Sequence, residues 1–276
     1  MRVSIIITTY NSPAWLEKVL WGFAVQTHKD FEILIADDGS GDETRALIDR
    51  LRGETGMEIV HVWHEDDGFR KTAILNKAIV QATADYLLFT DGDCIPRADF
   101  LQVHADNATK GYFLSGGYFK LPMETSEAIT KEDIETQRCF DVPWLKAHGL
   151  SGTYKTLKLT AHGWRQRLLN NMTPTKATWN GHNASGWKED LLAVNGYNED
   201  MQYGGLDREL GERLMNAGIK GKQIRYSAVV IHLDHKRGYA TKESIEKNRR
   251  IRDEVAAKNI TWTPNGIKKQ EAGLAD

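Results

Sequence analysis

The sequence predicts an α/β protein in which a mostly parallel central sheet is flanked by helices on both faces. Apolar, β-branched runs such as "VSIIIT" (3–8) are typical of strands buried on both sides, and segments with helical spacing alternate with them between residues 3 and 93. Four polar clusters, "TTYN", "ADDGS", "HEDDGFRK" and "TDGD", each follow a predicted strand. Because parallel strands end at one edge, we expect these clusters to share a ligand-binding rim.

The elements of the first half follow in order. After strand 3–8, Ser12 and Pro13 supply an N-cap and a first-turn proline for a helix. Further strands are expected in "FEILIADDGS" (31–40), "MEIVHVW" (57–63) and "DYLLFTD" (85–91). Helices are expected in "DETRALIDRLRG" (42–53), with Gly53 past its end, and in "KTAILNKAIVQAT" (71–83).

The pattern loosens after "YFLSGGYFKL" (112–121). Residues 123–148 read as helical and charged, and residues 149–178 as a mixed, basic insertion or lid. Order returns with a Gly-rich stretch and a short helix, then an amphipathic helix ending at Gly218 and a strand in "VVIHLDH". A basic helix (241–258) and a disordered Gly/Pro-containing tail are expected to end the chain.

Composition limits the class of protein. The 276 residues are 41% apolar and 27% charged, as in a soluble globular protein, and the net charge of -2 argues against a nucleic-acid partner. Two cysteines indicate a reducing compartment. The apolar run at the N-terminus is too short for a signal peptide or a membrane span, so we expect a cytoplasmic enzyme, with peripheral membrane contact left open.

The motif "TDGD" places Asp91 and Asp93 directly after a predicted buried strand. Two carboxylates there can hold a divalent cation that keeps open positions for phosphate oxygens. The alternative is an acidic surface turn, since Asp-Gly is a common turn dipeptide. The preceding strand and the three companion clusters favour the functional interpretation.

Three other clusters offer donor-binding groups. Asp38 can accept a hydrogen bond from a base or a ribose, or simply favour a helix N-terminus. Thr8 and Tyr10 can contact the same nucleoside, or form an ordinary capped loop. Arg70 and Lys71 lie near a helix start, where they suit a diphosphate; the alternative is a solvated pair.

The second half adds acidic residues and histidines. "YGGLDREL" places Asp207 and Glu209 after Gly205, where they are candidates for a general base, although acidic residues at a helix N-terminus are common. His232 and His235 follow a strand and form a weak metal-ligand signal.

Taken together, these residues resemble the GT-A glycosyltransferases of family 2 over residues 1–235. The opening segment through "IADDGSGDETRALI" is similar to the family's nucleotide-binding start, and "TDGD" is similar to its D-x-D motif. The later segment "NGYNEDMQYGGLDRELGERLMNAGI" with "VIHLDH" resembles a galactosyltransferase-type C-terminal segment. No single motif is specific, but their order is.

The resemblance implies roles for individual positions. Thr8, Tyr10 and Asp38 would hold the nucleoside, and Asp91 would touch the ribose or the metal. Asp93, with His232 or His235, would bind Mn²⁺ or Mg²⁺, and Asp207 falls on the base of such enzymes. Leu206 departs from the family, which usually has Glu at that position, and this weakens inferences about the acceptor.

The resemblance also implies a domain plan. Residues 1–121 would be the nucleotide-sugar-binding half, 122–178 a helical insertion on the acceptor side, 179–240 the galactosyltransferase-like half of the same domain, and 241–276 a C-terminal helix and tail. Acceptor contacts are expected from Gly205, Glu209 and Trp187, with Trp187 stacking on a sugar ring or else packing in the core.

The expected reaction is inverting, metal-dependent transfer of a hexosyl or N-acetylhexosaminyl group from a nucleotide-diphosphate donor, of UDP type, to a hydroxyl. A glycan or lipid-linked acceptor in capsule or lipopolysaccharide synthesis would suit the basic residues of 155–176 and 236–252, which also read as ordinary solvated surface. Two alternatives remain: a nucleotidyltransferase that makes a nucleotide sugar, and an inactive glycan-binding relative.

Overall fold

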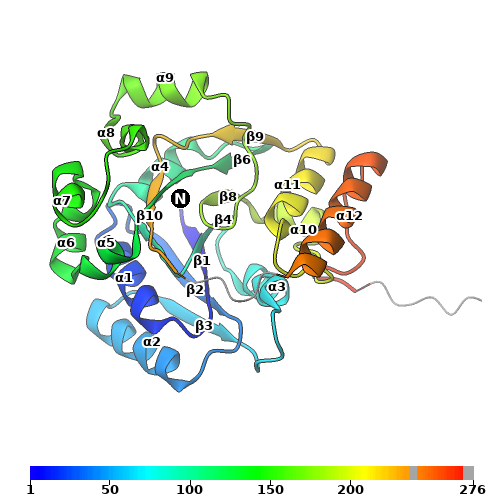
Figure 1. Ribbon diagram of the computed structural model, residues 1–276. Coiled ribbons are helices and arrows are strands. Elements are labelled where there is room, and N and C mark those ends of the chain that lie inside the picture. Colours follow the sequence, from blue (N-terminus) through cyan, green and yellow to red (C-terminus); the bar gives the residue numbers. More distant parts are fainter. Residues whose placement is uncertain (236–240, 270–276) are drawn as a thin grey trace, which may run out of the picture.

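A seven-stranded sheet forms the centre of the protein in a computed structural model that describes residues 1–235 and 241–269 (Figure 1). The strands lie in the order β3-β2-β1-β4-β8-β6-β9. The first four are mutually parallel, β8 is antiparallel to both of its neighbours, and β6 and β9 are parallel. This confirms the predicted α/β class. The strands are β1 (Val3–Thr9), β2 (Phe31–Asp37), β3 (Ile59–Trp63), β4 (Tyr86–Asp91), β6 (Tyr112–Ser115), β8 (Ala184–Trp187) and β9 (Lys220–Gln223).

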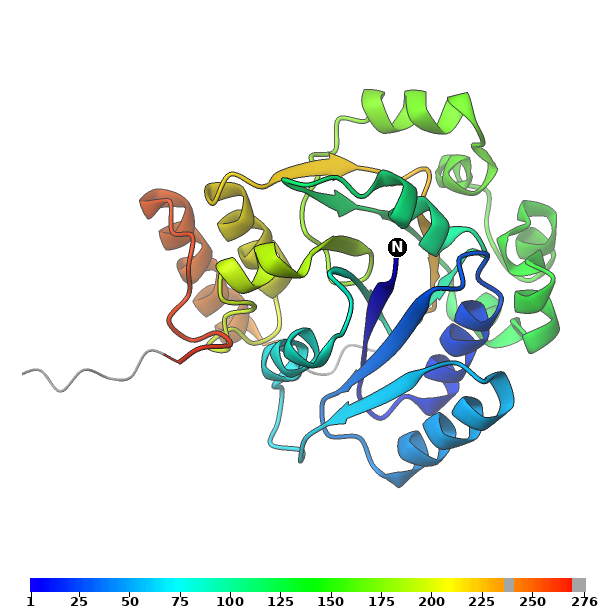
Figure 2. The same ribbon diagram turned by 180° about the vertical axis from the view of Figure 1, so that it is seen from behind.

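Side chains of β1 alternate between two hydrophobic cores. Ile5 and Ile7 pack on the side of the sheet that carries α1, α2 and α4, whereas Ile6 packs with α3, α10 and α11. All three isoleucines are fully buried, as a continuous apolar strand predicts. Figure 2 shows the helices on both faces of the sheet. They are α1 (Pro13–Ala24), α2 (Asp42–Thr55), α3 (Lys71–Gln81), α4 (Phe100–Asn107), α10 (Lys188–Ala193) and α11 (Leu206–Asn216).

A second sheet of three strands was not anticipated from the sequence. It has the order β5-β10-β7, from Cys94–Pro96, Val229–His232 and Gly117–Lys120. Its register pairs His232 with Cys94, the residue that directly follows Asp93. This small sheet therefore brings the histidine segment of the second half to the acidic motif of the first.

Residues 122–178 form short helices rather than one helical block. The helices α5 (Met123–Ala128), α6 (Lys131–Glu135) and α7 (Val142–Ala147) contribute or flank Ile129, Ile134 and Leu145 of the core beside α1. Two more, α8 (Leu157–Thr160) and α9 (Trp164–Met172), lie at the rim of the molecule in Figure 1. The 3₁₀ turns η1 (Arg138–Phe140) and η2 (Tyr154–Thr156) connect them.

Two predictions are wrong: the end of the second helix and the disorder of the whole segment after the last helix. The second helix continues through Gly53 to Thr55 and ends at Gly56, which takes the left-handed conformation (φ +66°) that glycine tolerates. The segment after α12 (Lys242–Lys258) is not free, because Asn195 Nδ2 donates to the carbonyl oxygens of Thr263 and Lys268 at 2.7 and 2.8 Å. The rest of that predicted disordered tail, residues 270–276, lies outside the described residues. Among the described residues, we find no helix of the length and apolarity needed to cross a bilayer.

A buried ion pair ties α11 to the loop after α10. The Arg213 guanidinium donates to both carboxylate oxygens of Glu209 at 2.7 and 2.8 Å, and both side chains are essentially inaccessible to solvent. The same guanidinium donates to the carbonyl oxygens of Val194 and Gly196. The buried charges of Arg213 and Glu209 are therefore paired with each other, and the guanidinium also has hydrogen-bond acceptors in the backbone.

We expect Glu209→Ala to destabilise the fold by about 3–5 kcal/mol, because it leaves the Arg213 charge buried without its partner. Denaturant unfolding measures the loss. Glu212→Ala is the matched control. Glu212 lies on the same helix as Glu209, but it is partly exposed and pairs with Arg252 of α12, so its loss should cost no more than about 1 kcal/mol. Equal, small losses for the two variants would contradict the structural role of Glu209.

Candidate functional site

A cleft of about 750 Å³ opens at the carboxyl ends of β1, β2 and β4. The register of these strands pairs Thr8 with Asp91 and Thr9 with Asp37, so the predicted polar clusters do meet at one edge. Ten of the thirteen site residues predicted from the sequence line the cleft: Thr8, Tyr10, Asp38, Lys71, Asp91, Asp93, Gly205, Asp207, His232 and His235.

Asp91 is held by two donors from different elements. The hydroxyl of Thr8 and the ammonium of Lys71 both donate to its Oδ1 atom, at 2.6 and 2.7 Å. Burial alone would raise the pKa of Asp91, but the charge of Lys71 and these hydrogen bonds hold the pKa well below its ordinary value. Burial opposes the charge of Lys71 as well, yet the carboxylates of Asp91, Asp207 and Asp93 raise its pKa. Both groups are therefore charged at neutral pH.

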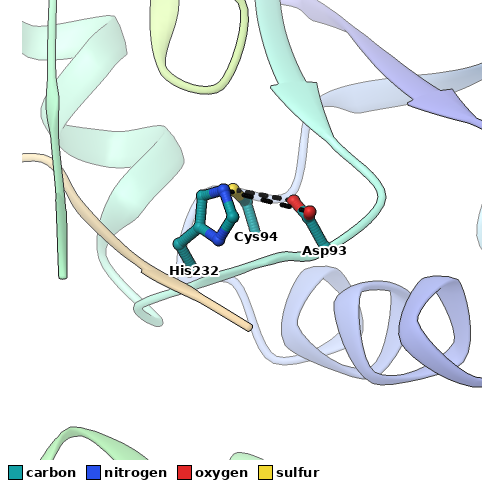
Figure 3. Close-up of side chains that lie close together, drawn as sticks. All are labelled: Asp93, Cys94 and His232. Carbon is teal, nitrogen blue, oxygen red and sulfur yellow. Dashed lines mark hydrogen bonds and ion pairs between the residues drawn. The ribbon is translucent and has the colours of Figure 1, made fainter. Parts of the chain in front are cut away.

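Asp93 faces two histidines and a thiol. Its Oδ2 atom lies 3.1 Å from His235 Nε2 and 3.9 Å from His232 Nε2, and Cys94 Sγ donates to its Oδ1 atom at 3.3 Å. Figure 3 shows Asp93, Cys94 and His232 converging, and their ligand atoms lie within 4.8 Å of one another. Cys94 was not singled out from the sequence, because only the pairing of β5 with β10 brings it to this point.

The donor set suits a divalent cation. His232 Nδ1 lies 2.7 Å from the carbonyl oxygen of Leu233, which fixes that nitrogen as the N–H donor and leaves the Nε2 lone pair directed toward Asp93. Burial raises the pKa of Asp93, with the nearby Asp91 charge adding to the rise and the histidines opposing it. A carboxylate and two imidazoles with this arrangement are typical ligands of Mn²⁺ and related ions.

Asp207 stands apart from the histidines, on the first turn of α11. The hydroxyl of Tyr197 lies 3.4 Å from its Oδ1 atom. Gly181 packs so closely that a Cβ atom there would lie 2.6 Å from the same oxygen. Burial raises the pKa of Asp207 to about 6; Asp91 adds to the rise, and Lys71, Tyr197 and the backbone of Gly181 oppose it. A carboxyl with this pKa is suited to accept a proton near neutral pH.

Asp38 reaches the cleft with both of its oxygens already engaged. His64 Nε2 lies 2.7 Å from Oδ1, and the backbone N–H of Arg70 donates to Oδ2 at 3.0 Å. A base N–H would therefore share or replace one of these bonds. Tyr10, half exposed, donates its hydroxyl to Asp66 at 2.9 Å and leaves its ring at the mouth of the cleft.

His182 also lines the cleft and was not predicted as a single site residue. It lies at the start of the "GHNASGW" segment, and its ring packs edge-on against Tyr118 with centroids 4.7 Å apart. Burial lowers the pKa of His182 to about 4, so the imidazole is neutral under ordinary conditions. It therefore adds a neutral polar group to the wall of the cleft that Asp91 and His232 also line.

The expected acceptor contact of Trp187 is wrong. Because β8 is antiparallel to β4, its first residue pairs with Phe89 near the cleft and Trp187 pairs with Tyr86 at the opposite edge of the sheet. Trp187 packs edge-on against Tyr86 at 5.1 Å, and the Lys110 ammonium lies 3.8 Å from its ring centroid. Trp187 therefore packs within the fold, which was the alternative interpretation of this residue.

Two further predictions need the same correction. Glu209 is committed to Arg213 in the buried pair and does not line the cleft, so we assign it a structural role. Arg70 turns its side chain to Asp67, 2.9 Å away and exposed, and contributes its backbone N–H to Asp38 instead. Of the two predicted cations, only Lys71 enters the cleft.

The loop before α11 completes the wall. Gly205 has φ +88°, a left-handed conformation that favours glycine, and it lines the cleft next to Leu206. Leu206 is 4% exposed and belongs to the core beside α3. An apolar side chain thus occupies the position where the resembling enzymes usually carry Glu.

The strand order and the Asp91-Gly92-Asp93 turn at the carboxyl edge of the sheet are typical of the GT-A fold, and solved glycosyltransferase structures share this fold. A model of glycosyl transferase family 2 matches residues 4–163, more than half of the chain, and the chain belongs to that family. The match ends at residue 163, before the galactosyltransferase-type segment of residues 179–240, so that segment stays a prediction.

Two relatives show the range of the similarity. Validoxylamine A glucosyltransferase of Streptomyces hygroscopicus subsp. jinggangensis is 30% identical over 234 residues, covering 79% of this chain and 52% of the relative. Hyaluronan synthase of Pasteurella multocida is 35% identical over 104 residues, or 37% of this chain and 10% of the synthase. The chain thus spans about half the length, or less, of these curated relatives.

Solved structures share the fold at low sequence identity. Staphylococcus aureus TarS (residues 1–349), in complex with UDP-GlcNAc, matches 94% of this chain and 69% of its own, with a TM-score of 0.60 and 16% identity. The mannosyltransferase PcManGT from Pyrobaculum calidifontis, in complex with GDP-Man and Mn²⁺, matches 86% of this chain and 58% of its own, with a TM-score of 0.58 and 19% identity.

We expect Asp207→Asn to stabilise the protein at pH 7.5. The raised pKa means that the folded state binds this proton more tightly than the unfolded state, so stability falls as the pH rises from about 4 to 6. Ionising a carboxyl whose pKa has risen from 3.8 to about 6 costs at most about 3 kcal/mol. Thermal unfolding should show a gain at pH 7.5 that shrinks as the pH falls toward 4. A loss of stability at pH 7.5 would contradict the assigned environment.

Proposed function

We propose that this chain is an inverting, metal-dependent glycosyltransferase that moves a sugar from a nucleotide-diphosphate donor, of UDP type, to an acceptor hydroxyl. The observation that carries the proposal is the separation of roles within one cleft. Asp207, with a pKa of about 6, lies on α11, whereas Asp91 is the last residue of β4 and Asp93 follows that strand. In the proposed reaction, the base and the donor-phosphate site would act on opposite sides of one sugar.

The donor side is formed by Thr8, Lys71 and Asp91. Lys71 is the cation of the proposed donor site; its ammonium donates to Asp91 and also interacts electrostatically with Asp93 and Asp207. A diphosphate entering this cleft meets that charge, which favours its binding and its departure. Tyr10 and Asp38, which also line the cleft, are the candidates for contacts with the nucleoside.

Asp93, His232 and His235 would hold the metal, of which Mn²⁺ or Mg²⁺ is expected. Such an ion, when bound, neutralises charge on the departing diphosphate. The contribution of the chain is to direct Asp93 and the His232 Nε2 lone pair at one point, with the carbonyl oxygen of Leu233 fixing the imidazole.

Asp207 would take the proton of the acceptor hydroxyl as that oxygen attacks the anomeric carbon. The bond to the donor phosphate breaks on the opposite face, so a single displacement inverts the configuration and needs one carboxylate. Gly181 leaves no side chain between Asp207 and the wall of the cleft, and Tyr197 orients the carboxyl. Leu206, next to this base in the sequence, would give the acceptor site a single apolar contact.

The relatives support a sugar-nucleotide donor without fixing which one. One curated relative is a glucosyltransferase, and the structural neighbours are complexes with UDP-GlcNAc in one case and GDP-Man with Mn²⁺ in another. A glycan or lipid-linked acceptor of bacterial surface polysaccharide synthesis remains our expectation. A nucleotidyltransferase is disfavoured because the β1 loop "TTYNSPAW" is not a glycine-rich phosphate loop.

Donor binding tests the proposal. We expect one UDP-sugar among UDP-, GDP- and TDP-sugars to bind calorimetrically with Mn²⁺ and to bind at least tenfold more weakly with EDTA. Asp93→Ala should lose the metal-dependent part of binding, whereas Asp106→Ala, a change at a surface acid on α4, should not. If no nucleotide sugar binds with or without metal, the assignment of this cleft as a donor site is wrong.

The pH dependence of turnover tests the base. Since Asp207 accepts a proton only when it is ionised, kcat/KM should rise with pH through about 6 and level off above it. Asp207→Asn should lower kcat by at least a hundredfold while donor affinity stays within a few-fold of wild type. Substantial turnover by this variant would remove Asp207 from the catalytic role and leave the donor site intact.

A further inference from the structure

Helix α9 exposes three of its four large apolar side chains, whereas the polar side chain of Asn170 faces the protein. Trp164, Leu168 and Met172 recur every four residues and so follow one face of the helix, with exposed fractions of 69%, 46% and 71%. On the protein side, Asn170 Nδ2 donates to Ser227 Oγ and Asn170 Oδ1 accepts from the backbone N–H of Tyr226, both at 2.9 Å. No residue of α9 is buried. An ordinary surface helix instead keeps its large apolar side chains against the core.

Positive charge flanks that apolar row. At helical spacing, Arg165 and Arg167 fall on either side of it, and both are exposed. The sequence from residue 142 to residue 188 contains no Asp or Glu, although the chain as a whole has a net charge of -2. Within this acid-free stretch lie Lys146, Lys155, Lys158, Arg165, Arg167, Lys176 and Lys188.

The neighbouring helix α8 extends the same surface. Tyr154 and Leu157 are 81% and 51% exposed just before and within it. Burial lowers the pKa of Lys158 to about 8, and the charges of Arg225 and Lys155 add to the effect, which marks a local excess of cations. Among residues 1–235 and 241–269, no ion pair forms to Lys155, Lys158, Arg165, Arg167 or Lys176. We call this surface of residues 154–172 the α8–α9 face.

We propose that the α8–α9 face docks on an anionic lipid bilayer, with Trp164, Leu168 and Met172 entering the headgroup region and Arg165 and Arg167 contacting lipid phosphates. An apolar row flanked by arginines is the pattern of a helix that lies in a membrane interface. Each cation near an anionic surface strengthens binding several-fold. The inference goes beyond the proposed reaction and does not depend on it.

The other basic helix of the chain lacks this pattern. In α12 the cations alternate with acids, and Arg252 pairs with Glu212, Arg249 with Asp253 and Lys258 with Glu254. Its largest exposed apolar side chain is Ile245, at 48%. Helix α12 therefore offers a basic surface of similar length for a control.

Co-sedimentation with lipid vesicles tests the proposal, with no donor or metal present. Vesicles of phosphatidylcholine containing a third phosphatidylglycerol should bind the wild-type chain at least tenfold more tightly than pure phosphatidylcholine vesicles. The triple variant Trp164→Ser, Leu168→Ser, Met172→Ser and the double variant Arg165→Gln, Arg167→Gln should each weaken binding at least tenfold. All five positions are exposed, so thermal unfolding should match wild type.

Matched controls separate a specific face from general stickiness. Val80→Ser, Leu192→Ser and Met215→Ser remove three exposed apolar side chains elsewhere, and Arg249→Gln with Arg250→Gln removes two cations of α12. These variants should bind vesicles as wild type does. The proposal is overturned if wild type ignores the anionic vesicles, if the controls lose as much as the α8–α9 variants, or if the apolar triple variant binds unchanged. Capture of soluble dextran sulfate without vesicle binding would also overturn it, in favour of an acidic glycan.

Discussion

Three carboxylates, those of Asp91, Asp93 and Asp207, share one cleft, and the ammonium of Lys71 makes their coexistence tolerable. Like charges in a partly buried site repel strongly, so a cation or protons must compensate for them. Lys71 bonds directly to Asp91 and acts on the other two through space. The three carboxyl groups therefore differ in pKa: the pKa of Asp91 is lowered, that of Asp93 is raised, and that of Asp207 is about 6. The chemistry we assign to each carboxylate follows from these differences.

The parallel half of the fold was predictable because its signals are local. The β-branched run of β1 and the polar turn after β4 both report burial and strand ends, so Thr8, Asp91 and Lys71 were correctly brought together. The predicted acceptor contacts of Trp187 and Glu209 were wrong because they depend on features that local sequence does not encode. Strand direction decides which end of β8 faces the cleft, and the partner of Glu209 lies one turn along α11 facing a loop that the pattern does not reveal.

Helix α12 supports the cleft from outside. Asn248 Nδ2 donates to the carbonyl oxygens of Gln202 and Gly204 at 2.8 and 2.9 Å, and Ser244 Oγ donates to that of Tyr203 at 3.2 Å. These bonds hold the glycine-containing loop that leads to Asp207. A loop of this composition would otherwise sample many conformations. The C-terminal helix, although distant from the sheet, therefore helps to fix the position of the candidate base.

The pairing of β10 with β5 has a consequence for the order of folding. Strands β3, β2, β1 and β4 are contiguous in sequence and can pair as soon as they are made, but β8 must insert between β4 and β6, and β10 must reach β5, from late in the chain. Contacts between distant segments form slowly because they close long loops. During synthesis, the parallel strands that carry the proposed nucleotide site would therefore exist before the histidines arrive, and the complete site would form only with the final strands.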